Sequence, residues 1–211
     1  MAEKLQVISL TVGQLQTNCY LMVDKSSRDA LIVDPGDDAD YIIRIISDHQ
    51  CKPVKIIATH GHFDHILAAA ELKLAFKIPF YIRGEDNFLV DRMKTSADHF
   101  LGITTSEPAK VDGFLKSKVT WGKSTMEIIH TPGHTPGSIC LYSKEEKILF
   151  CGDLLFAGRS VGRTDFAYSS QKDLEKSLKR IFRLPGETEV YPGHGEPFKL
   201  QSWQFIAKLD P

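Results

Sequence analysis

The sequence predicts an α/β fold in which two mixed β-sheets pack face to face and helices cover both outer surfaces. Runs of β-branched and apolar residues gather in two parts of the chain, near 6–33 and near 119–150. Each of these parts is followed by a stretch in which strand and helix patterns alternate. Two sheets that share an apolar interior, with the helices outside, satisfy this β-rich, αβ, β-rich, αβ order.

The first half of the chain contains the first expected sheet and its helices. Strands are expected at 6–10, 18–24, 30–33, 54–58 and 79–82. Helices are expected from Asp37 or Asp38 to just before Pro53, over 65–77, and from Gly84 to about Met93. The rest of 84–116 is the least regular part, and we expect a loop or weak helix there, near the mouth of the site.

The second half of the chain repeats this order of a strand-rich part followed by a helix and a further strand. Strands are expected to begin near Val119 and to continue at 126–130, 139–142, 147–150 and 189–191. Ser169 or Ser170 is expected to cap a helix that runs to about Leu184, where Pro185-Gly186 ends it. Residues 199–209 can form one closing helix.

Length and composition indicate an ordinary globular protein. The chain of 211 residues shows no repeat, low-complexity segment or linker, so we expect a single domain over 1–211. A formal net charge of -1 gives no field that would attract nucleic acid or an anionic membrane. There is no secretory signal pattern and no apolar run of membrane-spanning length, so we expect a cytoplasmic location.

Cysteine usage agrees with that location. Cys19, Cys51, Cys140 and Cys151 are scattered and form no CxxC pair. Three of them lie in or beside strand-like runs, where cysteine usually acts as a small buried hydrophobe. We therefore expect neither a disulfide nor a thiol nucleophile.

The stretch from Thr59 to His65 is the densest group of potential metal ligands. His60, His62, Asp64 and His65 occupy positions i, i+2, i+4 and i+5, a spacing that does not line one face of a helix. It suits a tight loop after a strand, where a glycine lets the backbone fold around an ion. The sequence therefore predicts a metal-binding turn between a buried strand and a helix.

Three later residues occur in the same context. His134 and His194 each follow a Pro-Gly pair, and Asp153 follows Gly152 at the end of a strand. Loops at strand ends are where functional side chains converge. Together with the four residues of the turn they make seven nitrogen and oxygen ligands, too many for one tetrahedral ion but suited to two ions that share a carboxylate.

With these residues the sequence resembles the metallo-β-lactamase superfamily of dinuclear hydrolases. The HxHxDH motif at 60–65 and the later ligands match in type and order over nearly the whole chain. The resemblance implies an αββα four-layer sandwich with the metals at one edge. It implies a first metal held by His60, His62 and His134, a second held by Asp64, His65 and His194, and Asp153 as the bridge. Zinc is the expected metal, with iron and manganese as alternatives.

Within the superfamily the chain looks most like glyoxalase II-type thioesterases. The supporting stretches are Thr17-Asn18-Cys19-Tyr20-Leu21, Val33-Asp34-Pro35-Gly36, the eight residues from Thr131, and Cys151-Gly152-Asp153-Leu154-Leu155-Phe156. Only 17 residues follow His194, so the chain resembles the short, single-domain bacterial type, without the helical domain that contributes basic residues to glutathione. The implied substrate is an S-(2-hydroxyacyl)glutathione such as S-lactoylglutathione. We expect a small-molecule thioester as the partner, and a monomer or small homo-oligomer.

Two arginines are candidates for substrate binding. Arg163 falls about where the resemblance places a lysine that contacts the glutathione carboxylate, and a guanidinium can hold a carboxylate with two hydrogen bonds. The alternative for Arg163 is a structural ion pair with Asp165 or another acid. Arg159 is the second, weaker candidate. Asp34 is expected to support the loop backbone near the site.

The resemblance implies hydrolysis by a hydroxide that bridges the two metals and attacks the thioester carbonyl. Asp64 and Asp153 are the expected catalytic carboxylates, Asp64 because it can orient the hydroxide or take its proton. One alternative is a persulfide dioxygenase, since His60, His134 and Asp153 alone would form the 2-His-1-carboxylate site of iron oxygenases. The other is a hydrolase of the same fold acting on another ester, a lactone or a phosphodiester.

Overall fold

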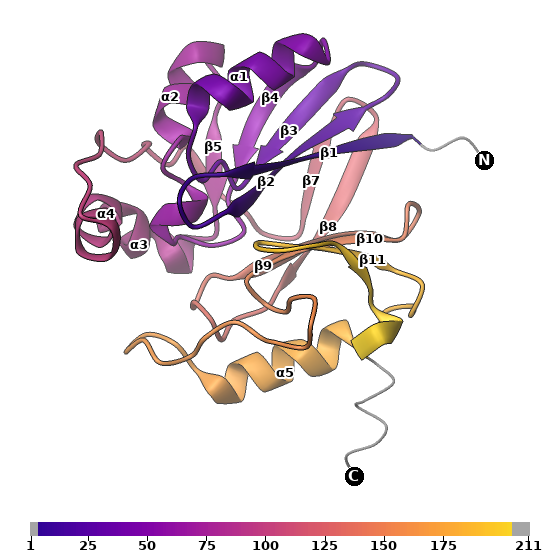
Figure 1. The fold of residues 1–211 in the computed structure, drawn as a ribbon. Helices are drawn as coiled ribbons and strands as arrows, with labels where there is room; N and C mark the ends of the chain where they lie inside the picture. Colours follow the sequence, from indigo (N-terminus) through magenta and orange to yellow (C-terminus); the bar gives the residue numbers. More distant parts are fainter. Residues whose placement is uncertain (1–3, 204–211) are drawn as a thin grey trace.

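The computed structural model describes residues 4–203, which form two six-stranded sheets (Figure 1). Strand order in the first sheet follows the sequence, with β1 Leu5–Val12, β2 Thr17–Asp24, β3 Asp29–Val33, β4 Lys52–Ile57, β5 Phe80–Ile82 and β6 Gly113–Phe114. The second sheet comprises β7 Lys118–Trp121, β8 Ser124–His130, β9 Ile139–Ser143, β10 Ile148–Gly152, β11 Glu189–Pro192 and β12 Phe198–Lys199. Both sheets are mixed, because β3 to β6 and the β10–β11 pair are parallel and the other pairs are antiparallel.

Helices cover the outer face of each sheet. Figure 1 shows α1 (Ala39–Asp48) and α2 (Ala69–Phe76) over the first sheet and α5 (Gln171–Ile181) over the second. Two short helices, α3 (Asn87–Asp91) and α4 (Met93–Leu101), lie at one end of the first sheet. The predicted α/β architecture of two mixed sheets with outer helices is therefore confirmed.

Three apolar layers hold the four layers of structure together. Strand β2 contributes side chains to two of these layers, because alternate side chains of a strand point to opposite faces of the sheet. Cys19, Leu21 and Val23 belong to the layer under α1 and α2. Tyr20 and Met22 belong to the layer between the sheets. A third layer packs β9 and β10 against α5. Because both faces of β2 are buried, its sequence is apolar without alternation.

The strand positions were largely predictable, and the ends of the helices less so. The helix expected over 65–77 begins later, because Phe63–His65 forms a 3-10 turn and α2 starts only at Ala69. Asp38 precedes α1 as expected, yet its carboxylate accepts a hydrogen bond from the Gly13 amide at 2.9 Å and makes none to the helix. Ser170 does cap α5, accepting from the Asp173 amide at 3.2 Å.

Two further differences concern weakly patterned segments. The region 84–116, expected to hold one helix followed by a loop or weak helix, contains a 3-10 turn at Gly84–Asp86, both α3 and α4, and the short strand β6. Of the closing helix expected over 199–209, residues 201–203 are helical, residue 199 belongs to β12, and 204–209 lie outside the described residues. Short strands such as β6 and β12, with two residues each, have no periodicity from which to predict them.

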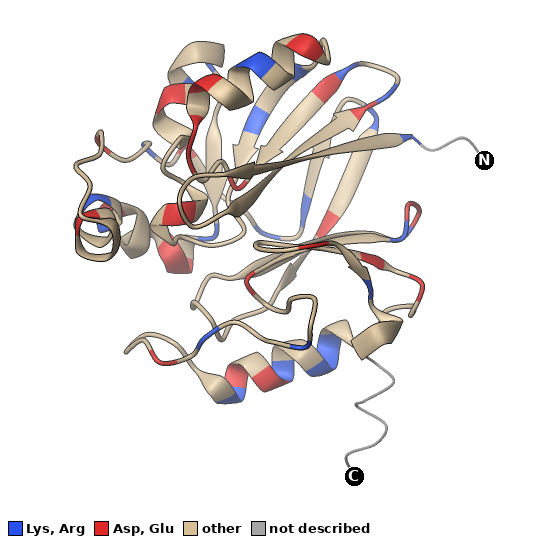
Figure 2. Cartoon of the chain, viewed as in Figure 1, with Lys and Arg blue, Asp and Glu red and all other residues tan. Residues whose placement is uncertain are grey.

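Charged side chains are mixed over the surface. Both acidic and basic positions occur along α5 and on both sheets, as Figure 2 shows. No helix within residues 4–203 combines the length and the apolarity needed to cross a membrane.

Candidate metal centre

Four loops meet at one edge of the two sheets and carry the seven predicted ligands. The first loop follows β4, the second joins β8 to β9, and the others follow β10 and β11. Backbone hydrogen bonds fasten them together: the Ile139 amide donates to the Thr59 carbonyl at 2.9 Å, and the Gly193 amide donates to the Gly152 carbonyl at 2.9 Å. The ligand-bearing loops are therefore part of the framework of both sheets.

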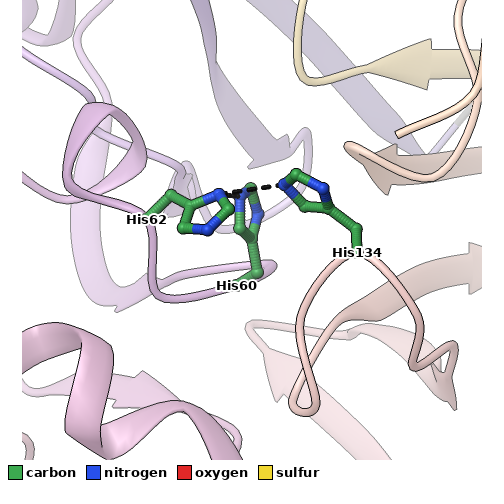
Figure 3. Close-up of side chains that lie close together, drawn as sticks. All are labelled: His60, His62 and His134. Carbon is green, nitrogen blue, oxygen red and sulfur yellow. Dashed lines mark hydrogen bonds between the residues drawn. The ribbon is translucent and has the colours of Figure 1, made fainter. Parts of the chain in front are cut away.

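His60, His62 and His134 form the first group of ligands. His62 Nδ1 lies 3.1 Å from His60 Nε2 and 2.9 Å from His134 Nε2, so three ring nitrogens converge on one point. Figure 3 shows that two of these rings come from one loop and the third from the facing loop. These are the three residues that the sequence assigns to a first metal.

The second group is Asp64, His65 and His194, whose ligand atoms lie within 4.8 Å of one another. Asp64 Oδ2 lies 3.6 Å from His65 Nε2 and 3.4 Å from His194 Nε2. Asp153 lies between the groups: its Oδ1 is 3.4 Å from His65 Nε2, and its Oδ2 is 3.6 Å from His134 Nε2. The structure thus brings all seven predicted ligands together, with Asp153 within reach of both groups.

Each of the five imidazoles is held from outside by its other ring nitrogen. These outer contacts are His60 Nδ1 to Thr59 Oγ1 (3.2 Å), His62 Nε2 to Tyr168 Oη (2.8 Å), His65 Nδ1 to Asp34 Oδ2 (3.1 Å), His134 Nδ1 to the Arg163 carbonyl (2.8 Å) and His194 Nδ1 to the Leu15 carbonyl (3.0 Å).

The outer contacts decide which nitrogen carries the proton. A carbonyl or carboxylate oxygen only accepts, so Nδ1 of His65, His134 and His194 must be the donor. The Thr59 hydroxyl donates to Asp34 Oδ2 at 2.6 Å, so it accepts from His60 in turn. In the neutral form of these four rings the inner nitrogen therefore carries the lone pair, the form in which histidine binds a metal.

Burial keeps His60 and His62 neutral. Burial, together with the neighbouring imidazoles, lowers the pKa of His62 to about 3 and holds that of His60 well below its usual range. For His65 burial acts in the same direction, but the carboxylates of Asp153, Asp64 and Asp34 outweigh it and raise the pKa well above its usual range. This end of the site thus has an excess of negative charge, which a cation would neutralise.

The donor set fits a pair of divalent ions. His65 Nε2 and Asp153 Oδ1 are buried and have no hydrogen-bond partner in the described part of the chain, an arrangement that costs free energy unless something else satisfies them. Both point into the cluster and lie 3.4 Å apart. Imidazole and carboxylate donors suit zinc, iron and manganese alike.

One glycine at the site is required because the backbone there passes very close to two of the ligands. A Cβ on Gly193 would lie 2.2 Å from Asp153 Oδ1 and 2.8 Å from His65 Cε1, so any side chain there would displace two ligands. The sequence argument that glycine before a ligand lets the chain crowd an ion applies directly at this position.

The cysteines take no part in the cluster. All four are free thiols, and Cys19, Cys140 and Cys151 are buried, as the sequence predicts. Burial raises the pKa of Cys140 to about 12, so its thiol stays protonated and unreactive at neutral pH.

A cavity of about 250 Å³ opens beside the ligands. Besides four of the ligands, its lining residues are Leu15, Phe63, Ser96, Phe100, Arg163, Phe166 and Tyr168. Arg163 therefore lies where the sequence places it, while the exposed Arg159 is not part of this lining. Arg163 is bound to Asp165 through two hydrogen bonds of 2.6 and 2.5 Å, which is the alternative left open by the sequence. Substrate binding by the two arginines remains a prediction.

Asp86 is a buried carboxylate that the sequence did not single out. It is fully buried and joins the two loops that carry the first ligand group. It accepts hydrogen bonds from the Gly61 amide (2.9 Å), the Thr135 hydroxyl (2.6 Å) and the Gly137 amide (2.6 Å). Since Gly61 lies between His60 and His62, and Thr135 follows His134, Asp86 sets the distance between the three imidazoles.

Replacing Asp86 is expected to weaken metal binding. Asp86→Ala leaves both loops without their common acceptor, and losing such a supporting contact typically lowers metal affinity about 10- to 100-fold. Titration of the metal-free protein with zinc, monitored by calorimetry, measures this affinity.

Asp24 offers a matched control. It is also buried and accepts from the Ser26 and Lys123 amides (both 2.8 Å), but it joins hairpins away from the ligand loops. Both alanine variants should lose about 2 to 3 kcal/mol of unfolding free energy, since each removes hydrogen bonds to a charged group. If Asp24→Ala weakened zinc binding as much as Asp86→Ala, the loss would be one of general stability and not of ligand placement.

The sequence matches known proteins along most of its length. Residues 12–194 match the sequence model of the Metallo-beta-lactamase superfamily. The hydroxyacylglutathione hydrolase GloC of Haemophilus influenzae is 33% identical over 201 residues, which cover 88% of this chain and 89% of GloC.

Solved structures agree with this match. The BLEG-1 B3 metallo-beta-lactamase superposes with a TM-score of 0.85 at 34% identity, covering 96% of this chain and 97% of that one. TTHA1623, solved in a di-iron-bound form, gives a TM-score of 0.84 at 35% identity, with coverage of 92% and 96%. The seven-residue cluster, the two packed sheets and these matches lead to one conclusion. The chain belongs to the metallo-beta-lactamase superfamily.

Proposed function

We propose that the protein is a dinuclear metal-dependent thioesterase of the glyoxalase II type, which hydrolyses S-(2-hydroxyacyl)glutathione. The observation that carries this proposal is the set of outer contacts on the imidazoles, which leaves the inner nitrogens free to bind two adjoining ions. Two such ions, when bound, lower the pKa of water and polarise a carbonyl. The similarity to GloC and the glyoxalase II-like stretches of the sequence support a thioester as the substrate.

The residues of the chain would have distinct tasks in this reaction. Asp64 lines the cavity and accepts from the Thr17 hydroxyl at 3.3 Å. With its carboxylate held in this way, Asp64 would take a proton from the attacking water. Asp153 would hold the two halves of the site together. A thiolate is a good leaving group, so the reaction needs no strong general acid, and the buried cysteines are not needed as nucleophiles.

A dinuclear site is favoured over the mononuclear iron alternative. A dioxygenase site built from His60, His134 and Asp153 would leave Asp64, His65 and His194 without a role. In this structure those three residues form their own ligand group, and Asp34 positions His65 within it. We further propose a single-domain, cytoplasmic enzyme with a small-molecule substrate and no nucleic acid or membrane partner.

A substrate panel on protein of measured metal content tests the proposal. We expect about two ions per chain and a kcat/KM for S-lactoylglutathione at least about 100-fold above that for a lactone or a β-lactam, a difference of about 2.7 kcal/mol. Glutathione persulfide should cause no oxygen uptake. One iron per chain with oxygen uptake on the persulfide would establish the dioxygenase instead, and preferential β-lactam turnover would establish a lactamase.

A further inference from the structure

The cavity beside the ligand cluster has an apolar wall that metal chemistry does not require. Leu15 and Phe100, which both line it, are 42% and 49% exposed. They are two of the four large apolar side chains that are at least 42% exposed in the described residues. Exposed apolar side chains gathered in a concave site indicate a surface for binding a ligand.

A continuous series of aromatic rings connects the rim of the cavity to the ligands. Ring centroids are 5.9 Å apart for Phe63 and Phe100, 6.3 Å for Phe100 and Phe166, and 5.2 Å for Phe166 and Tyr168. The Phe166 ring is in turn 5.3 Å from that of His62. An apolar substituent of an acyl group whose carbonyl lies at the ligand cluster can therefore lie against this wall.

The same cavity offers little to a highly charged ligand. Arg163 is the one lysine or arginine in its described lining, and two of its three guanidinium nitrogens, Nε and Nη2, donate to Asp165. The guanidinium also lies over the Phe166 ring, 4.4 Å from its centroid. A substrate carboxylate would compete with Asp165 for this guanidinium, whereas an apolar group meets the wall without breaking any contact.

We propose that the wall of Leu15, Phe100 and Phe166 is the acyl pocket and that it selects thioesters with an aromatic acyl group. This rests on the thioesterase function proposed above and adds that the acyl group, more than the thiol carrier, determines which substrate is preferred. The glutathione arm would then extend from the cavity, with Arg163 as its only cationic contact in the described lining.

Two matched pairs of compounds test the acyl pocket on the zinc-loaded protein. S-methylglutathione and S-benzylglutathione cannot be hydrolysed and differ only in the group that replaces the acyl chain, so calorimetry compares their Kd directly. S-lactoylglutathione and S-mandeloylglutathione give the corresponding comparison of kcat/KM. Burial of a phenyl group against the wall should favour the aromatic member of each pair about tenfold.

Variants locate the preference within the structure. Phe100→Ala and Leu15→Ala, on separate segments of the wall, should each remove most of the tenfold ratio. Phe114→Ala is the matched control, because Phe114 is 55% exposed and lies outside this cavity. Circular dichroism verifies that each variant is folded, and having two wall variants keeps the test decisive should one of them misfold.

The two assays separate the acyl pocket from the thioesterase function. Equal Kd values for the thioethers, with both thioesters hydrolysed equally well, would overturn the acyl pocket and leave the thioesterase intact. A benzyl preference that is lost in Phe100→Ala, without turnover of either thioester, would support the pocket and overturn the thioesterase. A preference unaffected by both wall variants would place the aromatic group elsewhere and refute the pocket.

Discussion

His62→Ala is expected to reduce thioester hydrolysis by about a thousandfold or more while the protein stays folded. His62 is the central member of the first ligand group, since its Nδ1 lies within 3.1 Å of the inner nitrogens of both His60 and His134. Without it the first ion would have two protein ligands from this group, fewer than the three that catalytic zinc sites usually provide. Most of the activation of water would be lost with that ion.

Stability should respond differently from activity. His62 belongs to none of the three apolar layers, so its removal leaves the cores intact. The free energy of unfolding of the metal-free variant should therefore lie within about 1 kcal/mol of that of the metal-free parent. His49→Ala, which changes an exposed histidine at the end of α1, is the matched control and should keep full activity. Normal turnover by His62→Ala would remove His62 from the set of metal ligands.

The ligand cluster could be predicted from the sequence because its signals are local. The residues of the 60–65 turn are close in sequence, and His134 and His194 each carry a Pro-Gly pair in front of them. The strand ends could be predicted too, since apolar runs stop at those glycines. Local motifs thus indicated the candidate ligands, and the resemblance to the metallo-β-lactamase superfamily divided them into two groups.

The groups that support the cluster gave no such signal. Tyr168 is 106 positions from His62, and Asp86 is 49 positions from Thr135. A lone tyrosine in a loop and a lone aspartate at the start of a helix look the same whether or not they reach a site. Their roles follow only from the way the two sheets pack.

The late start of α2 has a similar cause. Ile66, Leu67, Ala68 and Ala69 are buried and read as the continuation of a helix, so the sequence predicted one from the ligand turn onward. In the structure the backbone forms a 3-10 turn at Phe63–His65 first. A regular α-helix through the turn could not point Asp64 and His65 at the second group while His60 and His62 face the first. The need to place ligands in two groups overrides local helix propensity there.

Removal of the metal is expected to abolish hydrolysis and to lower the melting temperature. A ligand that binds only the folded chain stabilises it by about 4 kcal/mol when its free concentration is about 1,000 times its Kd. For a chain of this size that corresponds to a Tm shift on the order of 10 °C. The shift should be this large because His65 Nε2 and Asp153 Oδ1, buried without partners in the described structure, would lose what satisfies them.

Chelation followed by readdition of zinc, iron or manganese measures both effects on one sample. Activity and Tm should fall together after chelation and recover together, and the metal giving the highest kcat/KM identifies the catalytically competent ion. Asp153→Ala should show little Tm recovery with any metal, because it removes the carboxylate within reach of both ligand groups. Turnover that persists in the chelated protein would contradict metal-dependent hydrolysis. Recovery of Tm without recovery of turnover would keep the metal site and exclude the reaction proposed for it.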